Sequence, residues 1–338
     1  MIRVVGLGPG DPDAVPAAAL AALADAPDLF APPLAPALVA VLPRPPAPLG
    51  PLEALPAGAV VAAPDPEAHR LARALPGAET FPARDTLRDR AIGAEVAHLA
   101  AVGARLRREC PWDREQDAAS IVPHTIEEAF EVADAVAAGD TVKQADELGD
   151  LLFQSVFLCQ LLEEQGEWDL GVVARGQAEK LIHRHPHVYG DARAETAGRV
   201  VDQWERIKRA DRAGQGIFHD LPPGLPALAF ATKAQKRAAA VGFDFGGVPA
   251  ALAALREEVQ ELHADPGPGE LGDVLFAATA VGRQLGEDPE LALRAAAQRF
   301  RSRVDRAAAL AAEAGLRFEE LTPDEQLGWY AQGRLLGD

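Results

Sequence analysis

The chain has 338 residues, of which 48% are hydrophobic and 25% charged, and its formal net charge at pH 7 is −18. This composition is typical of a globular protein with room for two or three domains. The negative charge argues against a nucleic-acid-binding surface, which requires clustered basic residues. No apolar run approaches the roughly 18 residues of a membrane span, no basic-then-apolar leader is visible, and the two cysteines form no CxxC motif. We therefore expect a cytoplasmic protein without nucleic-acid or membrane partners.

The N-terminal stretch MIRVVGLGPG predicts a short strand followed by a Gly-rich turn. Its glycines miss the GxGxxG dinucleotide fingerprint, because position 11 is Asp. The turn resembles the GxGPGD loop of tetrapyrrole methylases, and VVAAPDP at 60–66 resembles a second segment of that family. The segment ends near residue 88, less than half the length that such a domain requires. We interpret 1–88 as a truncated α/β segment, with strand–helix–strand at 59–82 and an interaction or structural role.

From about residue 91 the apolar residues follow helical spacing, and Pro111 of CPWD ends the first helix. The predicted organisation is mainly α: two tandem all-α units of four to five helices, at 89–212 and 227–338, joined by a Gly/Pro-rich linker at 213–226. The remaining elements of the first unit are a helical hairpin at 124–165, a helix from Leu170 to about His185, a loop at 186–198 and a helix at 199–211. The second unit repeats this order and ends with helices at 288–314 and 323–335.

The hairpin carries an unusual set of acidic residues. Glu128 and Glu131 share one helix face, and so do Glu147 and Asp150, although like charges at this spacing cost a helix roughly 0.2–0.5 kcal/mol per pair. A Gly-Asp-Thr turn at 139–141 makes the two helices antiparallel, which brings these carboxylates together. The second pair opens a run of predicted core residues, which are Leu148, Leu151, Leu152, Phe153, Val156, Phe157, Leu158, Leu161 and Leu162.

Buried anions do not persist unpaired, and clustered carboxylate oxygens are neutralised by magnesium or manganese. The alternative is that these acids form a solvated helix face, which is the usual reading of one isolated pair. An internal repeat argues against it: EEVQE at 257–261 matches EEAFE at 127–131, and ELGDVLF at 270–276 matches ELGDLLF at 147–153 in six of seven positions.

Basic and aromatic residues follow the acids in the first unit. Lys180 and Arg184 are one helical turn apart, and so are Trp204 and Lys208. Carboxylates, three cations and an indole together suit a metal-bound triphosphate with a stacked base. Taken singly, Trp204 is more often a core residue and Lys208 a solvated surface residue.

The motifs CPWDREQ, EEAFE, ELGDLLF, KLIHRHPHVYG and QWERIK resemble those of the MazG family of all-α nucleoside triphosphate pyrophosphohydrolases. The resemblance is strong over 91–211 and looser over 227–336. It implies an enzyme, a hydrolase that converts (d)NTP and water to (d)NMP and pyrophosphate with Mg²⁺ (Mn²⁺ being possible), as nucleotide-pool housecleaning. It implies that Glu128, Glu131, Glu147 and Asp150 bind the metal.

The resemblance also assigns the remaining residues. Glu127 is the candidate for orienting or deprotonating the attacking water. The residues implied to bind substrate are Lys180, Arg184 and Lys208 at the phosphates and Trp204 at the base. The family further implies a homodimer.

The second unit departs from the family pattern although its acids survive as Glu258, Glu261, Glu270 and Asp273. Its Trp329 is followed one turn later by Gly333 instead of lysine. We therefore expect the first unit to be the active one and the second to be impaired or structural.

Two other functions compete with the hydrolase. One is a non-catalytic nucleotide- or partner-binding regulator on the same scaffold, which has no need for so many clustered carboxylates. The other is a methyltransferase acting through residues 1–88, which the short length of that segment disfavours.

Overall fold

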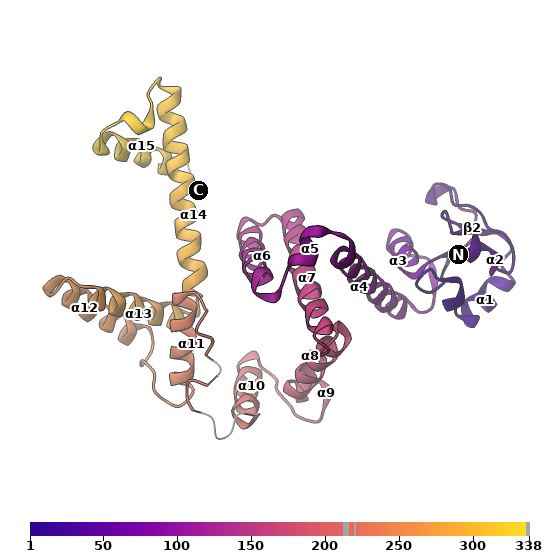
Figure 1. Cartoon of the computed structure of the whole chain (residues 1–338), viewed down its shortest axis with the longest axis horizontal. Coiled ribbons are helices and arrows are strands. Elements are labelled where there is room, and N and C mark those ends of the chain that lie inside the picture. The colour runs from indigo at the N-terminus through magenta and orange to yellow at the C-terminus, as the bar shows by residue number, and fades with distance from the viewer. Residues whose placement is uncertain (212–215, 220, 336–338) are drawn as a thin grey trace. The chain divides into compact units, whose positions relative to one another are not determined.

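A computed structural model describes residues 1–211, 216–219 and 221–335. It divides into two compact units, one of Met1–Ala135 with Asp140–Arg175 and one of Val136–Gly139 with Gly176–Asp338. The structure is mainly helical with one small sheet near the N-terminus, which confirms the predicted fold class (Figure 1). Within the described residues, every helix is too short or too polar to cross a lipid bilayer.

The N-terminal part of the first unit is an α/β layer built on a five-stranded parallel sheet with strand order β3-β2-β4-β1-β5. The strands are β1 (Arg3–Gly6), β2 (Leu29–Ala31), β3 (Ala47–Pro48), β4 (Val60–Ala63) and β5 (Glu79–Phe81). The helices between them are α1 (Ala17–Ala24), α2 (Pro36–Ala40) and α3 (Asp65–Ala74). The predicted strand–helix–strand at 59–82 is present as β4, α3 and β5.

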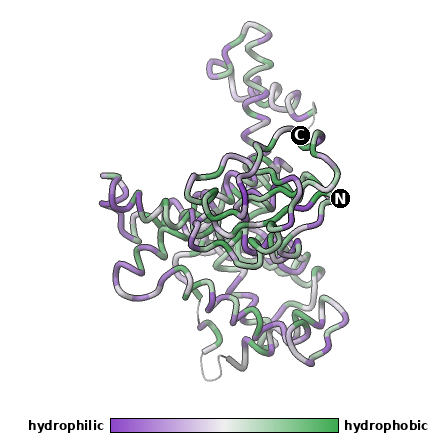
Figure 2. Tube along the Cα trace, turned by 90° about the vertical axis from the view of Figure 1, so that its right-hand side faces the viewer, coloured by the Kyte–Doolittle hydropathy of each residue, from purple (hydrophilic) through white to green (hydrophobic). Residues whose placement is uncertain are grey.

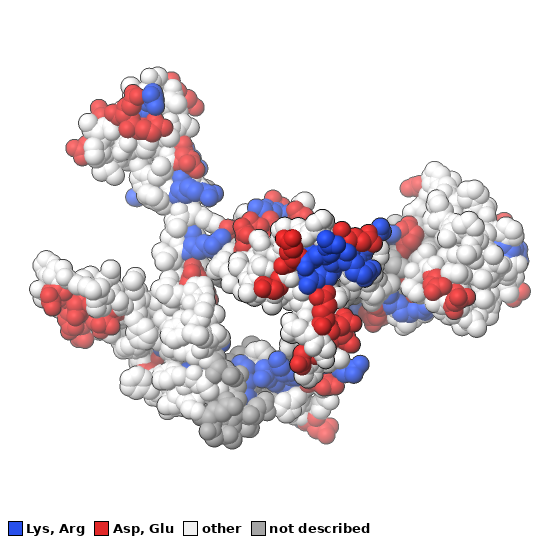
Figure 3. All heavy atoms as spheres, in the orientation of Figure 1, with Lys and Arg blue, Asp and Glu red and all other residues white. Residues whose placement is uncertain are grey.

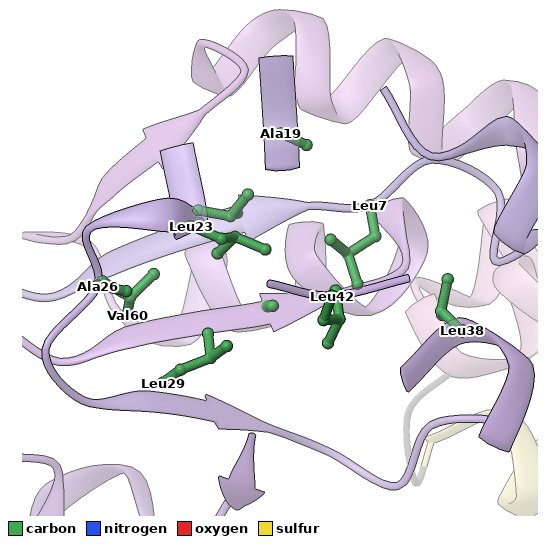
Figure 4. Packing of buried hydrophobic residues seen from close by; sticks show 10 residues of the cluster. Leu7, Ala19, Leu23, Ala26, Leu29, Leu38, Leu42 and Val60 are labelled. Atoms are coloured by element: carbon green, nitrogen blue, oxygen red, sulfur yellow. The ribbon is translucent and has the colours of Figure 1, made fainter. Parts of the chain in front are cut away.

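Successive residues of β1 point to opposite faces of the sheet, so the layer has two apolar cores. Val5 and Leu7 join the cluster that includes Leu23 of α1, which Figure 4 shows around Leu7. Val4 packs with Val61 on the other face, toward α3. The sheet is thus buried on both sides, as parallel sheets require.

The Gly-rich turn after β1 is closed by a buried carboxylate. Asp65, which is 2% exposed, accepts a hydrogen bond from the Gly8 amide at 3.0 Å and pairs with Nε of Arg90 at 2.8 Å. Gly8 adopts φ +88°, a conformation that favours glycine, and a Cβ on Gly6 would collide with the Asp65 carboxylate. The turn is therefore held by the protein's own acid.

The helical part of the first unit follows the predicted order. Its helices are α4 (Arg84–Glu109), α5 (Pro111–Glu115), α6 (Ala118–Ala138), α7 (Thr141–Glu164) and α8 (Leu170–Arg184), the last of which continues into the second unit. Helix α4 ends one residue before Cys110, as Pro111 predicts, although it begins seven residues earlier than the predicted 91. Along the helices, hydrophobic and hydrophilic residues alternate (Figure 2).

The predicted core of α7 is only partly correct. Val156, Phe157 and Leu161 are buried, and Phe157 and Leu161 pack against Ile121 at the start of α6. Leu148 is 52% exposed and Leu152 45% exposed, and Leu162 is exposed too. The difference arises because the apolar cluster covers the C-terminal half of α7, whereas Leu148 and Leu152 lie on the half that carries the acids.

The second unit contains α9 (Pro186–Tyr189), α10 (Ala197–Asp211), α11 (Ala227–Ala239), α12 (Val248–Ala264), α13 (Pro268–Leu285), α14 (Pro289–Glu313) and α15 (Pro323–Leu335). The last five match the predicted second repeat. The predicted loop at 186–198 is wrong in part, because Pro186 begins the short helix α9, where its missing N–H costs nothing. Residues 212–215 and 220 of the predicted linker lie outside the described residues.

Candidate active site

The two acid-bearing helices of the first unit are joined by a tight turn. Gly139 has φ +68°, and the Asp140 side chain caps α7 by accepting hydrogen bonds from the amides of Val142 and Lys143 at 3.1 and 3.0 Å. Such capping satisfies amides that have no partner within the helix. The turn fixes where α7 starts, and with it the position of Glu147 relative to α6.

Three of the predicted metal ligands converge. Glu128 of α6 and Glu147 and Asp150 of α7 each offer a carboxylate oxygen, and these oxygens lie within 4.8 Å of one another. We call these three residues the first acid cluster. Glu147 is buried at 7% exposure, Glu128 is half-buried and Asp150 is exposed. The site therefore has a buried floor and an open mouth.

The first acid cluster is electrostatically strained. Burial raises the pKa of Glu128, and repulsion from Asp150, Glu131 and Glu147 raises it further. Burial also raises the pKa of Glu147, with a further rise from the charge of Glu131 and a hydrogen bond to it, while Lys143 acts in the opposite direction. A divalent cation would relieve this repulsion, so the donor set and its charge fit Mg²⁺ or Mn²⁺.

The other two acids of the hairpin lie beside the cluster. Glu131 contacts Glu147 and is half-buried, which keeps it available as a further ligand. Glu127 points instead toward His124, with 3.8 Å between Oε2 and Nδ1, and its side chain is 66% exposed. Sequence spacing alone did not separate Glu127 from Glu128.

The second unit contains an equivalent arrangement, the second acid cluster, formed by Glu258 of α12 and Glu270 and Asp273 of α13. Their carboxylate oxygens also lie within 4.8 Å of one another. Figure 3 shows acidic side chains gathered over the α12–α13 hairpin. Burial raises the pKa of Glu258, followed by repulsion from Glu261, Asp273, Glu270 and Glu257. Glu261 is exposed and is not one of the three converging acids.

The predicted substrate-binding residues lie on α8 and α10 and belong to the second unit. Lys208 Nζ lies 4.5 Å from the ring centroid of Trp204, so the two side chains at this spacing are in contact. His185 packs on the same indole, with 5.5 Å between ring centroids. Arg184 is half-buried and Lys180 is exposed.

Several buried polar atoms cluster in this region. Nε of Arg184, Nδ1 of His187 and Nε1 of Trp204 have no hydrogen-bond partner among the described residues. Buried donors are normally satisfied by protein, water or ligand. The roles assigned to Lys180, Arg184, Trp204 and Lys208 remain predictions.

Sequence reasoning missed an aromatic cavity in the second unit. It has a volume of about 270 Å³ and is lined by Phe218, Phe243, Phe245 and Phe276, together with Gln235 and Arg283. The signal was the sequence GFDF after α11, which places two aromatics close together in a chain that is only 5% aromatic.

One wall of the cavity is a polar network. The Arg283 guanidinium forms an ion pair with Asp244, and this hydrogen bond holds the pKa of that carboxyl below its usual value. The buried Gln235 accepts from Nε of Arg283 at 3.4 Å and donates to the Phe276 carbonyl at 2.9 Å. The network fixes Phe276 one turn beyond Asp273 of the second acid cluster.

The expected loss of a Trp–Lys pair in the second unit has a structural reason. Gly333 is buried against α14, and a Cβ there would lie 3.1 Å from the Arg303 carbonyl oxygen. Its own carbonyl accepts a hydrogen bond from Arg306 at 2.9 Å. A lysine side chain has no room at this position.

Comparison with known proteins places this geometry in a family. The profile of the MazG nucleotide pyrophosphohydrolase domain matches residues 116–189, which contain the first acid cluster. The nucleoside triphosphate pyrophosphohydrolase of Escherichia coli K12 is 38% identical over 237 residues, covering 66% of this chain and 90% of the relative. The nucleoside triphosphate pyrophosphohydrolase/pyrophosphatase MazG of Thermotoga maritima is 37% identical over 235 residues, covering 68% and 90%.

A solved structure also matches. The crystal structure of a MazG-related protein from Thermotoga maritima aligns with 33% of this chain and 98% of its own, at 23% identity and a TM-score of 0.31. The identity and coverage of the two sequence relatives are what decide the assignment. The chain belongs to the MazG nucleotide pyrophosphohydrolase family.

Proposed function

We propose that this chain hydrolyses nucleoside triphosphates, ribo- or deoxyribo-, to the monophosphate and pyrophosphate in a Mg²⁺-dependent reaction at the first acid cluster. The observation that carries the proposal is the convergence of Glu128, Glu147 and Asp150 inside the segment that matches the MazG domain. The two relatives at 37–38% identity carry the name of this activity. The role that follows is removal of unwanted nucleotides from the pool.

In this reaction water attacks the α-phosphorus, the bond between that phosphorus and the oxygen bridging to the β-phosphorus breaks, and pyrophosphate leaves. The bound divalent ion would supply neutralisation of the negative charge on the phosphates. Glu128, Glu147 and Asp150 would hold it, with Glu131 as a further ligand. Glu127 is exposed and next to His124, so it is free to orient the water and accept its proton.

The substrate is held by groups of complementary chemistry. Lys180, Arg184 and Lys208 supply positive charge for phosphate oxygens. The unpartnered Nε of Arg184 supports this role, because a phosphate oxygen would satisfy it. Trp204 would line the base pocket, with Lys208 already lying over its ring.

The second unit is a competing location for the same chemistry. Its acids converge as closely as those of the first unit, and the aromatic cavity beside Phe276 offers stacking surfaces of a size that suits a nucleobase. Against it stands the missing lysine one turn after Trp329. We retain the first unit as the active one.

We also propose a homodimer. The exposed Leu148 and Leu152 recur as exposed Leu271 and Leu275 at equivalent positions of the second repeat. Leucines that are solvated at both equivalent positions indicate a surface that is completed by a second copy. A cytoplasmic location, and the absence of nucleic-acid partners, remain predictions from composition.

The test measures pyrophosphate release from a panel of canonical and modified nucleotides with Mg²⁺. It compares the wild type with Glu128→Gln/Asp150→Asn and with Glu258→Gln/Asp273→Asn. Glu163→Gln, on the exposed far end of α7, is the control for loss of a carboxylate as such. Loss of activity in the first double variant only would support the proposal.

Loss in the second double variant only would move the chemistry to the second unit and leave the function intact. A folded wild type that binds nucleotide without releasing pyrophosphate would favour the non-catalytic regulator. Methyl transfer needs S-adenosylmethionine, so absence of its binding in calorimetry would end the methyltransferase alternative.

A further inference from the structure

The first acid cluster has a cation built into its own helix. Lys143 lies one turn before Glu147 on α7, with 3.6 Å between its Nζ and Oε1 of Glu147. The lysine side chain is 53% exposed, whereas that of Glu147 is 9% exposed. The ammonium group therefore sits at the solvent side of the buried carboxylate that forms the floor of the cluster.

Helix stability does not account for this lysine. It occupies the first turn of α7, where the positive end of the helix dipole disfavours a cation. A lysine placed before a glutamate is also the less favourable order for a pair four residues apart. The position therefore costs the helix a little, and the attraction to the acids offsets that cost.

The second acid cluster provides an internal comparison. Glu147 and Glu270 occupy the same place in the repeated ELGD sequence, and the residue four positions before Glu270 is Pro266. Pro266 precedes the start of α13 and carries no charge. The two clusters thus offer three converging carboxylates each, but only the first has a lysine at this place.

We propose that Lys143 is the counter-cation of the metal-free first acid cluster and must leave Glu147 when a divalent ion enters. The first acid cluster consequently binds a divalent ion more weakly than the second does in the absence of nucleotide. This inference rests on the proposed function in that both clusters are taken as divalent-ion sites. It makes Lys143 a positioning residue that sets how readily the first site fills.

The size of the effect follows from Coulomb's law. A unit charge roughly 6 Å from a divalent ion, in surroundings as polarisable as water, changes the affinity for that ion about tenfold. Removing the ammonium should tighten ion binding by about this factor. Keeping the charge as a guanidinium should leave the affinity nearly unchanged.

The experiment uses the full chain with Glu258→Gln and Asp273→Asn, so that only the first acid cluster is intact. Mn²⁺ is the probe, and its free concentration is read from its electron paramagnetic resonance signal. Adding Lys143→Met should lower the dissociation constant for Mn²⁺ about tenfold. Lys143→Gln must show the same direction, and Lys143→Arg should behave like the parent.

Arg105→Met is the matched control, because it removes the cation of an exposed pair of the same order, Arg105 to Glu109 at 2.9 Å on α4. It should leave Mn²⁺ binding unchanged. In the reverse background, with Glu128→Gln and Asp150→Asn, the second acid cluster should bind Mn²⁺ more tightly than the first does, and Lys143→Met should have no effect.

Unchanged or weaker Mn²⁺ binding in folded Lys143→Met, or no Mn²⁺ binding at the first acid cluster in any variant, would overturn the inference. Pyrophosphate release with saturating Mn²⁺, measured on the wild type, separates this from the proposed function. Tightened binding without any pyrophosphate release would refute the hydrolase and leave the role of Lys143 standing.

Discussion

The ion pair between Asp244 and Arg283 makes a quantitative prediction for the aromatic cavity. Asp244 accepts from both terminal nitrogens of the guanidinium and from Nε2 of Gln284 at 3.0 Å. The Arg283 side chain is 10% exposed, so Asp244→Ala leaves a buried cation without its carboxylate. Breaking a buried pair from one side costs about 3–5 kcal/mol, and because Asp244 is a third exposed we expect about 2–3 kcal/mol.

Hydrogen exchange of α11 and α13 amides is the appropriate assay, because it reports the opening free energy of this unit alone. Asp244→Ala, Arg283→Met and the double variant form a cycle, in which the double variant should cost little more than either single one. Additive costs in that cycle would refute the reasoning. Because the pKa of Asp244 is lowered, the stabilisation should persist above the usual aspartate pKa and disappear as the pH falls through the lowered value.

Three further predictions concern the first unit. Arg107→Met removes hydrogen bonds to two backbone carbonyls and to Glu164 and should cost about 2–3 kcal/mol in urea unfolding; Glu164→Gln should cost less than about 1, and equal costs would contradict this account. Gly6→Ala, whose Cβ would strike a buried carboxylate, should lower the melting temperature, whereas Gly77→Ala has open space and should be neutral; matching shifts would disprove it. The raised pKa of Glu147 means that the folded state binds more protons, so metal-free stability should rise as the pH falls from 7 through that pKa; Glu147→Gln should flatten this profile, and a profile that Glu147→Gln leaves unchanged would refute this assignment.

The presence of two acid clusters in one chain has a consequence for interpreting activity. Their oxygens converge within the same 4.8 Å, but the first has Lys143 beside Glu147 and the second has an aromatic cavity beside Phe276. Metal titrations of the whole chain should therefore show two unequal sites. Activity has to be assigned with one cluster removed at a time.

The local features of this protein could be read from its sequence. Helix ends at Pro111 and Asp140, and the repeated acid signature, depend on residues within a turn or two of one another, where backbone geometry restricts the outcome. The same periodicity showed that Glu147 and Asp150 share a face. Family membership followed from these motifs, because their spacing along each helix is itself the signature.

Only the tertiary structure decided which of these residues meet. Glu127 and Glu128 are neighbours in sequence, yet one faces His124 and the other joins Glu147 across the hairpin. The aromatic cavity draws Phe218, Phe243 and Phe276 from separate segments. Distances between helices depend on how their side chains pack, and periodicity along one helix carries no information about that packing.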